Sequence, residues 1–272
     1  MNNLATRSVT ATGFVIVMVG TMLLGPIASA VLFLIVTYLC IEEYIKLSAT
    51  TGAHPDRFLT LIVGVSVYIV VASTALYQLD VRWIALILLL MLLLMIAELY
   101  HNKPNPFTNI SWMVLAVVYI AIPFALLIHF FNVDGEGWKE RSGLILSFFV
   151  ILWLNDTGAY FVGSLTGKHK LFERISPKKS WEGSIGGGII ALLTAWGLSF
   201  LFVQYSLLQW FMIALVIIVF GTLGDLVESM LKRSVGVKDS GNMLPGHGGV
   251  LDRFDAVLLA SPMVYLLINF IN

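Results

Sequence analysis

The densest group of chemically capable side chains lies between Lys232 and Asp255, in the stretch KRSVGVKDSGNMLPGHGGVLDRFD. It contains four basic side chains, three carboxylates, one histidine and five glycines. Glycines allow backbone N–H groups to turn towards an anion, and lysine and arginine neutralise phosphate charge. This composition predicts a loop that binds phosphate groups.

Carboxylates flank this loop at helical spacing. One helix face carries Asp225, Glu228, Ser229 and Lys232. Asp252 and Asp255 are three residues apart and share a face of the following helix. Because carboxylate oxygens are the ligands that Mg²⁺ prefers, we predict a metal site whose candidate ligands are Asp225, Asp252, Glu228 and Asp255. The alternative is that these acids only form salt bridges with Lys232, Arg233 and Arg253.

A second polar loop, GSLTGKHKLFERISPKKSWEGSIGGG, runs from Gly163 to Gly188. Lys178 and Lys179 stand beside Ser180, directly before a glycine-rich helix start. One interpretation is a second phosphate clamp over the same pocket. The other is a basic membrane anchor with Trp181 at the interface. The glycines that follow also suit close helix packing.

The preceding span contains NDTGAYFVGSLTG, which is unusually small and polar for a membrane helix. Small residues admit a neighbouring helix or a ligand close to the backbone. Asn155 and Asp156 are therefore candidates for a polar pocket, together with Asp239 of the charged loop. Asp156 could hold a metal, a nucleotide hydroxyl or an amine, or make a structural contact. His247 has two open interpretations: phosphate contact or proton transfer, and simple hydrogen bonding.

Composition places these loops in a membrane protein. Of 272 residues, 58% are hydrophobic and 12% are charged, and the mean hydropathy is +0.91. A soluble protein of this length could not bury so much apolar surface. The net charge of zero says nothing about partners, and we expect no nucleic-acid binding. The single cysteine, Cys40, excludes an internal disulfide.

A helix needs about 20 apolar residues to cross a bilayer. On that basis we predict an all-α polytopic protein with about nine transmembrane helices, the first retained rather than cleaved as a signal peptide. The expected spans are 9–24, 27–45, 58–77, 82–100, 110–131, 142–163, 184–204, 208–231 and 250–270. With the N-terminus inside, 13 of the 16 Lys and Arg residues are cytoplasmic, which predicts an N-in, C-out orientation.

Most of the membrane-level carboxylates and both large polar loops lie in the second half of the chain, which predicts two regions. Residues 1–140 would form a scaffold that gives lipid access and dimer contacts. Residues 141–272 would form the catalytic region, with cytoplasmic loops at 164–183 and 232–249. In the first region Glu42, Glu43 and Glu98 end their spans, so we expect them to reach water at the interface.

The pattern from Ser229 to Asp255 resembles the signature of phosphatidate cytidylyltransferases (CDP-diacylglycerol synthases). It reads S-x-L-K-R, four residues, K-D-x-G, two residues, then L-P-x-H-G-G-V-x-D-R-F-D, without departure at any fixed position. The segments NDTGAYFVG and SPKKSWEGSIGG are similar to the same family. The resemblance covers about the last 120 residues well and the first 140 only in hydropathy.

The resemblance implies transfer of CMP from CTP to phosphatidate, giving CDP-diacylglycerol and pyrophosphate. It also implies Mg²⁺, with K⁺ as a second ion by analogy, a homodimer, and a site facing the cytoplasm and the bilayer of a bacterial plasma membrane. The implied catalytic residues are Asp225, Asp252, Lys232, Lys238 and His247. Substrate phosphates would contact Lys178, Lys179, Ser180, Ser229, Arg233, Gly248, Gly249 and Arg253.

Two other functions stay open from the residues. A CTP-dependent kinase of polyprenol or phytol type would transfer the γ-phosphoryl group to a lipid hydroxyl. An ion-coupled transporter would use intramembrane acids as an ion path, although such proteins tend to have inverted repeats and midplane charges. Here the acids lie at the cytoplasmic ends of the spans and no repeat is visible.

Overall fold

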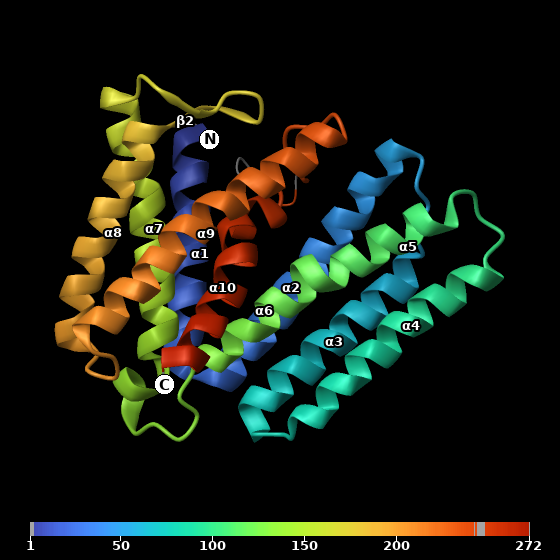
Figure 1. Ribbon diagram of the computed structural model, residues 1–272, viewed down its shortest axis with the longest axis horizontal. Coiled ribbons are helices and arrows are strands. Elements are labelled where there is room, and N and C mark those ends of the chain that lie inside the picture. Colours follow the sequence, from blue (N-terminus) through green and yellow to red (C-terminus); the bar gives the residue numbers. More distant parts are fainter. Residues whose placement is uncertain (1–2, 242, 244–247, 272) are drawn as a thin grey trace. The chain divides into compact units, whose positions relative to one another are not determined.

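The computed structural model describes residues 3–241, 243 and 248–271. They form a mostly helical chain (Figure 1). The α-helices are α1 (Asn3–Leu24), α2 (Pro26–Ser48), α3 (Arg57–Tyr77), α4 (Ala85–Tyr100), α5 (Pro106–Leu115), α6 (Ile122–Leu126), α7 (Gly137–Thr166), α8 (Trp181–Leu201), α9 (Leu207–Ser234) and α10 (Leu251–Ile271). This confirms the all-α class.

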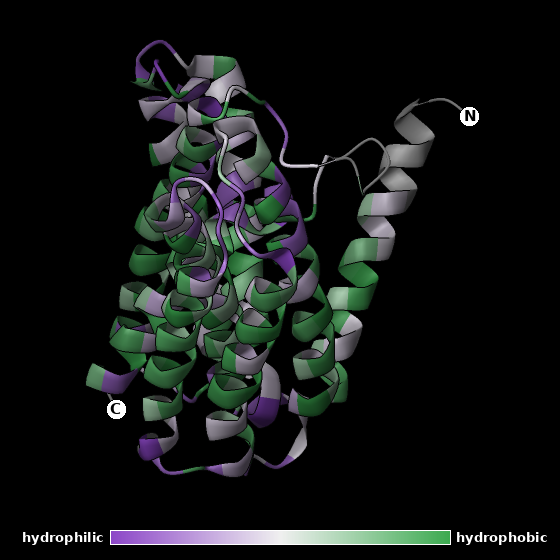
Figure 2. Cartoon of the chain, turned by 90° about the vertical axis from the view of Figure 1, so that its right-hand side faces the viewer, coloured by the Kyte–Doolittle hydropathy of each residue, from purple (hydrophilic) through white to green (hydrophobic). Residues whose placement is uncertain are grey.

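Among the described residues, seven helical stretches are long and apolar enough to cross a membrane. They are Pro26–Thr51, Arg57–Tyr77, Pro106–Phe130, Gly137–Thr166, Trp181–Leu201, Leu207–Ser234 and Leu251–Ile271. The other two expected spans are helical and apolar but shorter, at Thr10–Leu24 and Ala85–Tyr100. Figure 2 shows hydrophobic residues along the helices and hydrophilic residues towards their ends and in the connecting segments. The count of nine and the orientation stay predictions.

Two local sequence signals account for helix boundaries. Gly25 separates α1 from α2 with a φ of 111°, a conformation that glycine adopts without strain, and Pro26 then begins α2. The span expected at 110–131 is continuous but irregular, since a π-helical turn at Ala116–Ala121 precedes α6. Pro123 has no N–H to donate to the preceding turn, which explains why the regular hydrogen-bond ladder shifts there.

The chain packs as two compact units. Unit 1 comprises Met1–His129 and Ser234–Phe254, and unit 2 comprises Phe130–Arg233 and Asp255–Asn272. The charged loop after α9 therefore packs with the N-terminal helices. The division at residue 140 into scaffold and catalytic regions is a statement about function and stays a prediction.

Unit 1 is built on helices that are sequence neighbours, with α2 against α3 and α3 against α4 (Figure 1). Its aromatic core includes Phe124, whose ring stacks on Phe33 at a centroid distance of 6.2 Å. Phe254 packs edge-on against Phe124 at 5.2 Å and against Phe14 at 5.6 Å. Burial of Phe254 anchors the end of the charged loop in this core.

Unit 2 is organised by the close packing of α7 on α8, which lie side by side in Figure 1. A Cβ added to Gly187 of α8 would lie 2.5 Å from the backbone oxygen of Asn155 and 2.9 Å from Cβ of Ala159. A Cβ on Gly158 would lie 3.2 Å from Cα of Gly187. The glycines therefore let the two backbones approach closely, which confirms the close packing predicted from the small residues.

A short antiparallel hairpin joins α7 to α8, with strands β1 (Lys170–Phe172) and β2 (Ser176–Ser180). We expected a cytoplasmic loop here, and the sequence pattern did not predict strands. At the end of β2, Ser180 caps α8, because its Oγ accepts the N–H of Gly183 at 3.2 Å. The hairpin therefore fixes the residues before Ser180 at the start of α8.

The glycine packing predicts the effect of a methyl group. Gly187→Ala should lower the free energy of unfolding by about 1–3 kcal/mol, because the new Cβ forces α7 and α8 apart. Thermal unfolding of purified protein in detergent measures this. The control is Gly197→Ala in the same helix, where no atom lies within 4 Å of the added Cβ. Equal melting temperatures for the two variants would contradict the packing argument.

Candidate functional site

Three carboxylates and one lysine gather in unit 2. Lys179 of β2 pairs with Asp225 of α9, with Nζ 2.5 Å from Oδ2. Asp156 of α7 and Asp255 of α10 interact electrostatically with both members of this pair. Four separate elements thus bring their charges to one place. Because one ammonium faces three carboxylates, this acidic cluster is suited to attract a cation.

The close packing of α7 on α8 positions this acidic cluster. Gly158 and Gly187 bring the backbones together one turn or less from Asp156, and the capped start of α8 holds β2 and its Lys179. Asn155 is buried, and its Nδ2 lies 3.4 Å from Oδ1 of Asp156. The sequence predicted Asn155 and Asp156 as members of a polar pocket, which stays a prediction, and the structure adds Lys179 as a neighbouring amine of Asp156.

The predicted polar face of α9 is present. Ser229 donates its hydroxyl to Oδ1 of Asp225 at 3.2 Å. Lys232 Nζ lies 2.5 Å from Oε2 of Glu228, and their side chains are 11% and 0% exposed. Removing either partner of such a buried pair alone strongly destabilises the protein, because the other charge is left buried and unpaired. Glu228 and Lys232 therefore form a salt bridge, as the alternative to a metal site proposed. The pairing of Asp225 with Lys179 was not predicted.

In unit 1 the glycine-rich loop holds an anion that belongs to the protein. Oδ2 of Asp252 accepts the backbone N–H of Ser240 at 3.0 Å and that of Gly249 at 2.8 Å. Gly248 has a φ of 82°, and a Cβ there would lie 2.9 Å from the same oxygen. The prediction of inward-turned N–H groups is thus met by Asp252. The loop's contact with substrate phosphate stays a prediction.

Several other predicted phosphate contacts are exposed side chains. They are Lys178, Arg233, Lys238 and Arg253, and Asp239 is exposed as well. Ser180 is buried and serves as the cap of α8. His247 lies outside the described residues, so its predicted role stays a prediction.

The four predicted metal ligands are divided between the units. Asp225, Glu228 and Asp255 belong to unit 2, whereas Asp252 belongs to unit 1. Within the described ranges, no three His, Cys, Asp or Glu side chains form a group that could bind one metal ion. Mg²⁺ is commonly held by one or two carboxylates together with substrate phosphates, so the oxygen donors present fit that ion without a complete protein cage.

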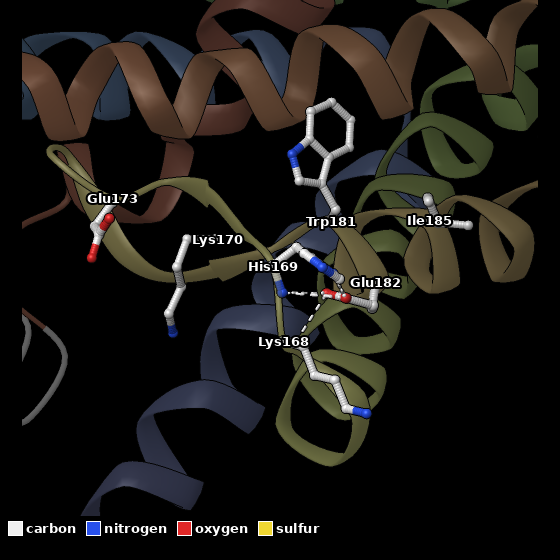
Figure 3. Close-up of a pocket in the computed structure, with 7 residues that line it drawn as sticks. All are labelled: Lys168, His169, Lys170, Glu173, Trp181, Glu182 and Ile185. Atoms are coloured by element: carbon white, nitrogen blue, oxygen red, sulfur yellow. Dashed lines mark hydrogen bonds and ion pairs between the residues drawn. The ribbon is translucent and has the colours of Figure 1, made fainter.

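A pocket of about 700 Å³ lies elsewhere in unit 2, at the hairpin and the start of α8 (Figure 3). Its lining residues are Lys168, His169, Lys170, Glu173, Trp181, Glu182 and Ile185. His169 Nδ1 lies 2.6 Å from Oε1 of Glu182, while the amino groups of Lys168 and Lys170 point in different directions (Figure 3). None of these residues was predicted as a site residue.

The interpretation of the N-terminal glutamates as water-reaching residues is wrong. Glu42, Glu43 and Glu98 are only 4%, 2% and 2% exposed. Glu42 pairs with Arg57, with 2.7 Å between Oε1 and Nη2, and Glu98 accepts a hydrogen bond from Asn109 at 2.6 Å. Glu43 contacts the charged loop, accepting the N–H of Leu251 at 2.9 Å. The sequence did carry a signal for these partners: a carboxylate within an apolar run is costly unless a cation or a hydrogen-bond donor pairs with it.

Comparison with known proteins agrees with the signature. Residues 5–271 match the model of the cytidylyltransferase family. A phosphatidate cytidylyltransferase of Staphylococcus saprophyticus is 32% identical over 264 residues, which cover 96% of this chain and 98% of that protein. Phosphatidate cytidylyltransferases of Staphylococcus haemolyticus and Bacillus subtilis are 42% and 43% identical over 68% and 65% of this chain, and the same shares of those proteins. The chain belongs to the cytidylyltransferase family.

Proposed function

We propose that the protein is a membrane nucleotidyltransferase that transfers CMP from CTP to phosphatidate, giving CDP-diacylglycerol and pyrophosphate. The observation that carries this proposal is the match of nearly the whole chain to the family model and to a relative named phosphatidate cytidylyltransferase. The glycine-rich loop and three members of the acidic cluster, Asp156, Lys179 and Asp255, support it, because they lie in the segments that resemble the family.

In the proposed reaction an oxygen of the lipid phosphate attacks the α-phosphorus of CTP. A new bond forms between that oxygen and the α-phosphorus. The bond from the α-phosphorus to the oxygen that bridges it to the β-phosphorus breaks, and pyrophosphate leaves with the electron pair of the broken bond. The attacking phosphate is already ionised near neutral pH, so no strong general base is needed. Catalysis then depends on positioning two anions in line and neutralising their charge.

Basic residues would supply much of that neutralisation. Lys179 already faces carboxylates, and its ammonium is available to a phosphate that approaches Asp225. Exposed Lys178, Arg233, Lys238 and Arg253 would contact the remaining phosphate oxygens from the water side. Lys232 would act close to the chemistry only after leaving Glu228.

Asp225 and Asp252 would hold Mg²⁺, with Asp255 as a further ligand and Glu228 available only if it separates from Lys232. Bound there, Mg²⁺ would stabilise negative charge on the phosphates and the leaving pyrophosphate. Asp156 and Asn155 would form the polar pocket beside it, together with Asp239. A potassium ion as second cation rests on the family resemblance alone.

We further propose a bacterial plasma membrane location with the site facing the cytoplasm. The bacterial relatives and the cytoplasmic bias of Lys and Arg support this orientation. The diacyl tails would stay in lipid while CTP arrives from water. A homodimer is proposed from the family resemblance.

The position of the transferred phosphorus tests the function. Purified protein in detergent is given phosphatidate, Mg²⁺ and CTP labelled at either the α- or the γ-phosphate. Label from the α-position should enter the lipid, with release of pyrophosphate. Entry of γ-label would instead identify the CTP-dependent lipid kinase. Absence of both, together with ion flux in vesicles, would favour the transporter.

The pair of Lys179 and Asp225 predicts a difference between two lysines of the hairpin. Lys179→Gln should lower kcat/KM at least about tenfold, because loss of a charged hydrogen bond is worth roughly 1.5–3 kcal/mol. Lys170→Gln, in exposed β1, is the matched control and should change kcat/KM by less than about twofold. Steady-state kinetics with CTP measure both. The reverse ranking would move the phosphate clamp to the pocket of Figure 3.

A further inference from the structure

Glu43 of α2 is a buried carboxylate that contacts the charged loop from a part of the chain without signature residues. Its Oε2 accepts the backbone N–H of Leu251 at 2.9 Å and the hydroxyl of Ser240 at 3.2 Å. Glu43 is 2% exposed, and about 200 residues of chain separate it from both partners. One side chain thus joins Ser240 and Leu251, two points of the charged loop that are eleven residues apart.

The glycines of the loop fit this carboxylate. A Cβ on Gly241 would lie 2.6 Å from Oε1 of Glu43 and 2.9 Å from its Cδ. A Cβ on Gly249 would collide with Oε2 of Glu43 and with Oγ of Ser240. Any larger residue at either position would push the carboxylate away. Two of the five glycines in the stretch are therefore explained by the close approach of Glu43.

Ser240 connects Glu43 to Asp252. Its hydroxyl donates to Oε2 of Glu43, and its backbone N–H donates to Oδ2 of Asp252 at 3.0 Å. Gly249 donates to the same Asp252 oxygen, and the next-but-one residue, Leu251, donates to Glu43. The two carboxylates therefore both bind Ser240, and each also accepts one backbone N–H from the segment 249–251. Displacement of Glu43 would release the segment that orients Asp252.

Glu43 buries more hydrogen-bonding capacity than its contacts with Ser240 and Leu251 use. Oε1 of Glu43 is buried and has no hydrogen-bond partner among the described residues. Burying an unsatisfied carboxylate oxygen is costly, and an apolar residue would fill the same space more favourably. Groups that carry this kind of cost are concentrated at functional sites.

We propose that Glu43 is a positioning residue for the candidate site, which holds Ser240 and Leu251 so that the carboxylate of Asp252 is correctly oriented for the reaction. The expected fall in kcat rests on the proposed function. The expected loosening of the loop rests only on contacts within unit 1. It assigns to the N-terminal helices a direct part in building the site. No role of this kind was predicted for residues 1–140.

The test compares Glu43→Ala and Glu43→Gln with a matched control, Glu42→Ala. Glu42 is the adjacent residue of α2, is similarly buried, and pairs with Arg57 rather than with the loop. Hydrogen exchange of peptides covering residues 234–254 reports the loop directly. Initial rates with CTP and phosphatidate give kcat and KM.

Glu43→Ala should raise exchange in residues 234–254, leave exchange in α7 and α8 unchanged, and lower kcat about tenfold or more with a smaller change in KM for CTP. Glu43→Gln retains an acceptor oxygen for Leu251 and Ser240, so it should recover most of the loop protection and of kcat. Glu42→Ala should keep both. If Glu43→Ala does not accumulate, Ser240→Ala removes the connecting hydroxyl and should raise loop exchange in the same way.

Wild-type exchange and wild-type kcat in Glu43→Ala would overturn the proposal, as would equal loop exchange in Glu42→Ala. If the wild-type protein transfers no CMP, the proposed function fails. The exchange comparison then still decides whether Glu43 holds the loop.

Discussion

The constraint on which the rest of the structure depends is the cost of a carboxylate in an apolar, helical chain. An ionised group removed from water must find a cation or hydrogen-bond donors. Glu228 is paired with Lys232, Asp225 with Lys179, and Asp252 with two backbone N–H groups. These pairings determine which side chains face each other at the ends of the helices. The two compact units are built around them and around the glycines that allow close approach.

Periodicity and hydropathy predicted most of the helices, because an apolar run of sufficient length has few alternatives in a membrane. The small residues near Gly158 and Gly187 also predicted close helix packing, although not that α7 and α8 would be the partners. The hairpin was missed, since a polar segment of this length carries little periodicity. The partners of Lys179 and Glu43 were missed as well, because they come from distant positions that spacing along one helix cannot connect.

The charged loop has two roles. Its glycines and backbone N–H groups bind carboxylates of the protein itself, and its exposed basic side chains are left to face water and the substrates. Ser240, Gly249 and Leu251 are thus held by carboxylates of the protein before a substrate phosphate arrives. Such preorganisation lowers the cost of positioning two anionic substrates.

In the proposed site, Asp225 and Asp252 bind a divalent cation. Mn²⁺ prefers the same oxygen ligands as Mg²⁺, and its binding is followed by electron paramagnetic resonance. Titration of the wild-type protein, Asp225→Asn, Asp252→Asn and the control Glu182→Gln tests the claim most directly. We expect the wild-type protein to bind Mn²⁺ at a saturable site. The affinity for Mn²⁺ should fall at least about tenfold in both Asn variants, because each loses a charged ligand, and should be unchanged in Glu182→Gln. Equal Mn²⁺ binding by all four proteins would contradict it.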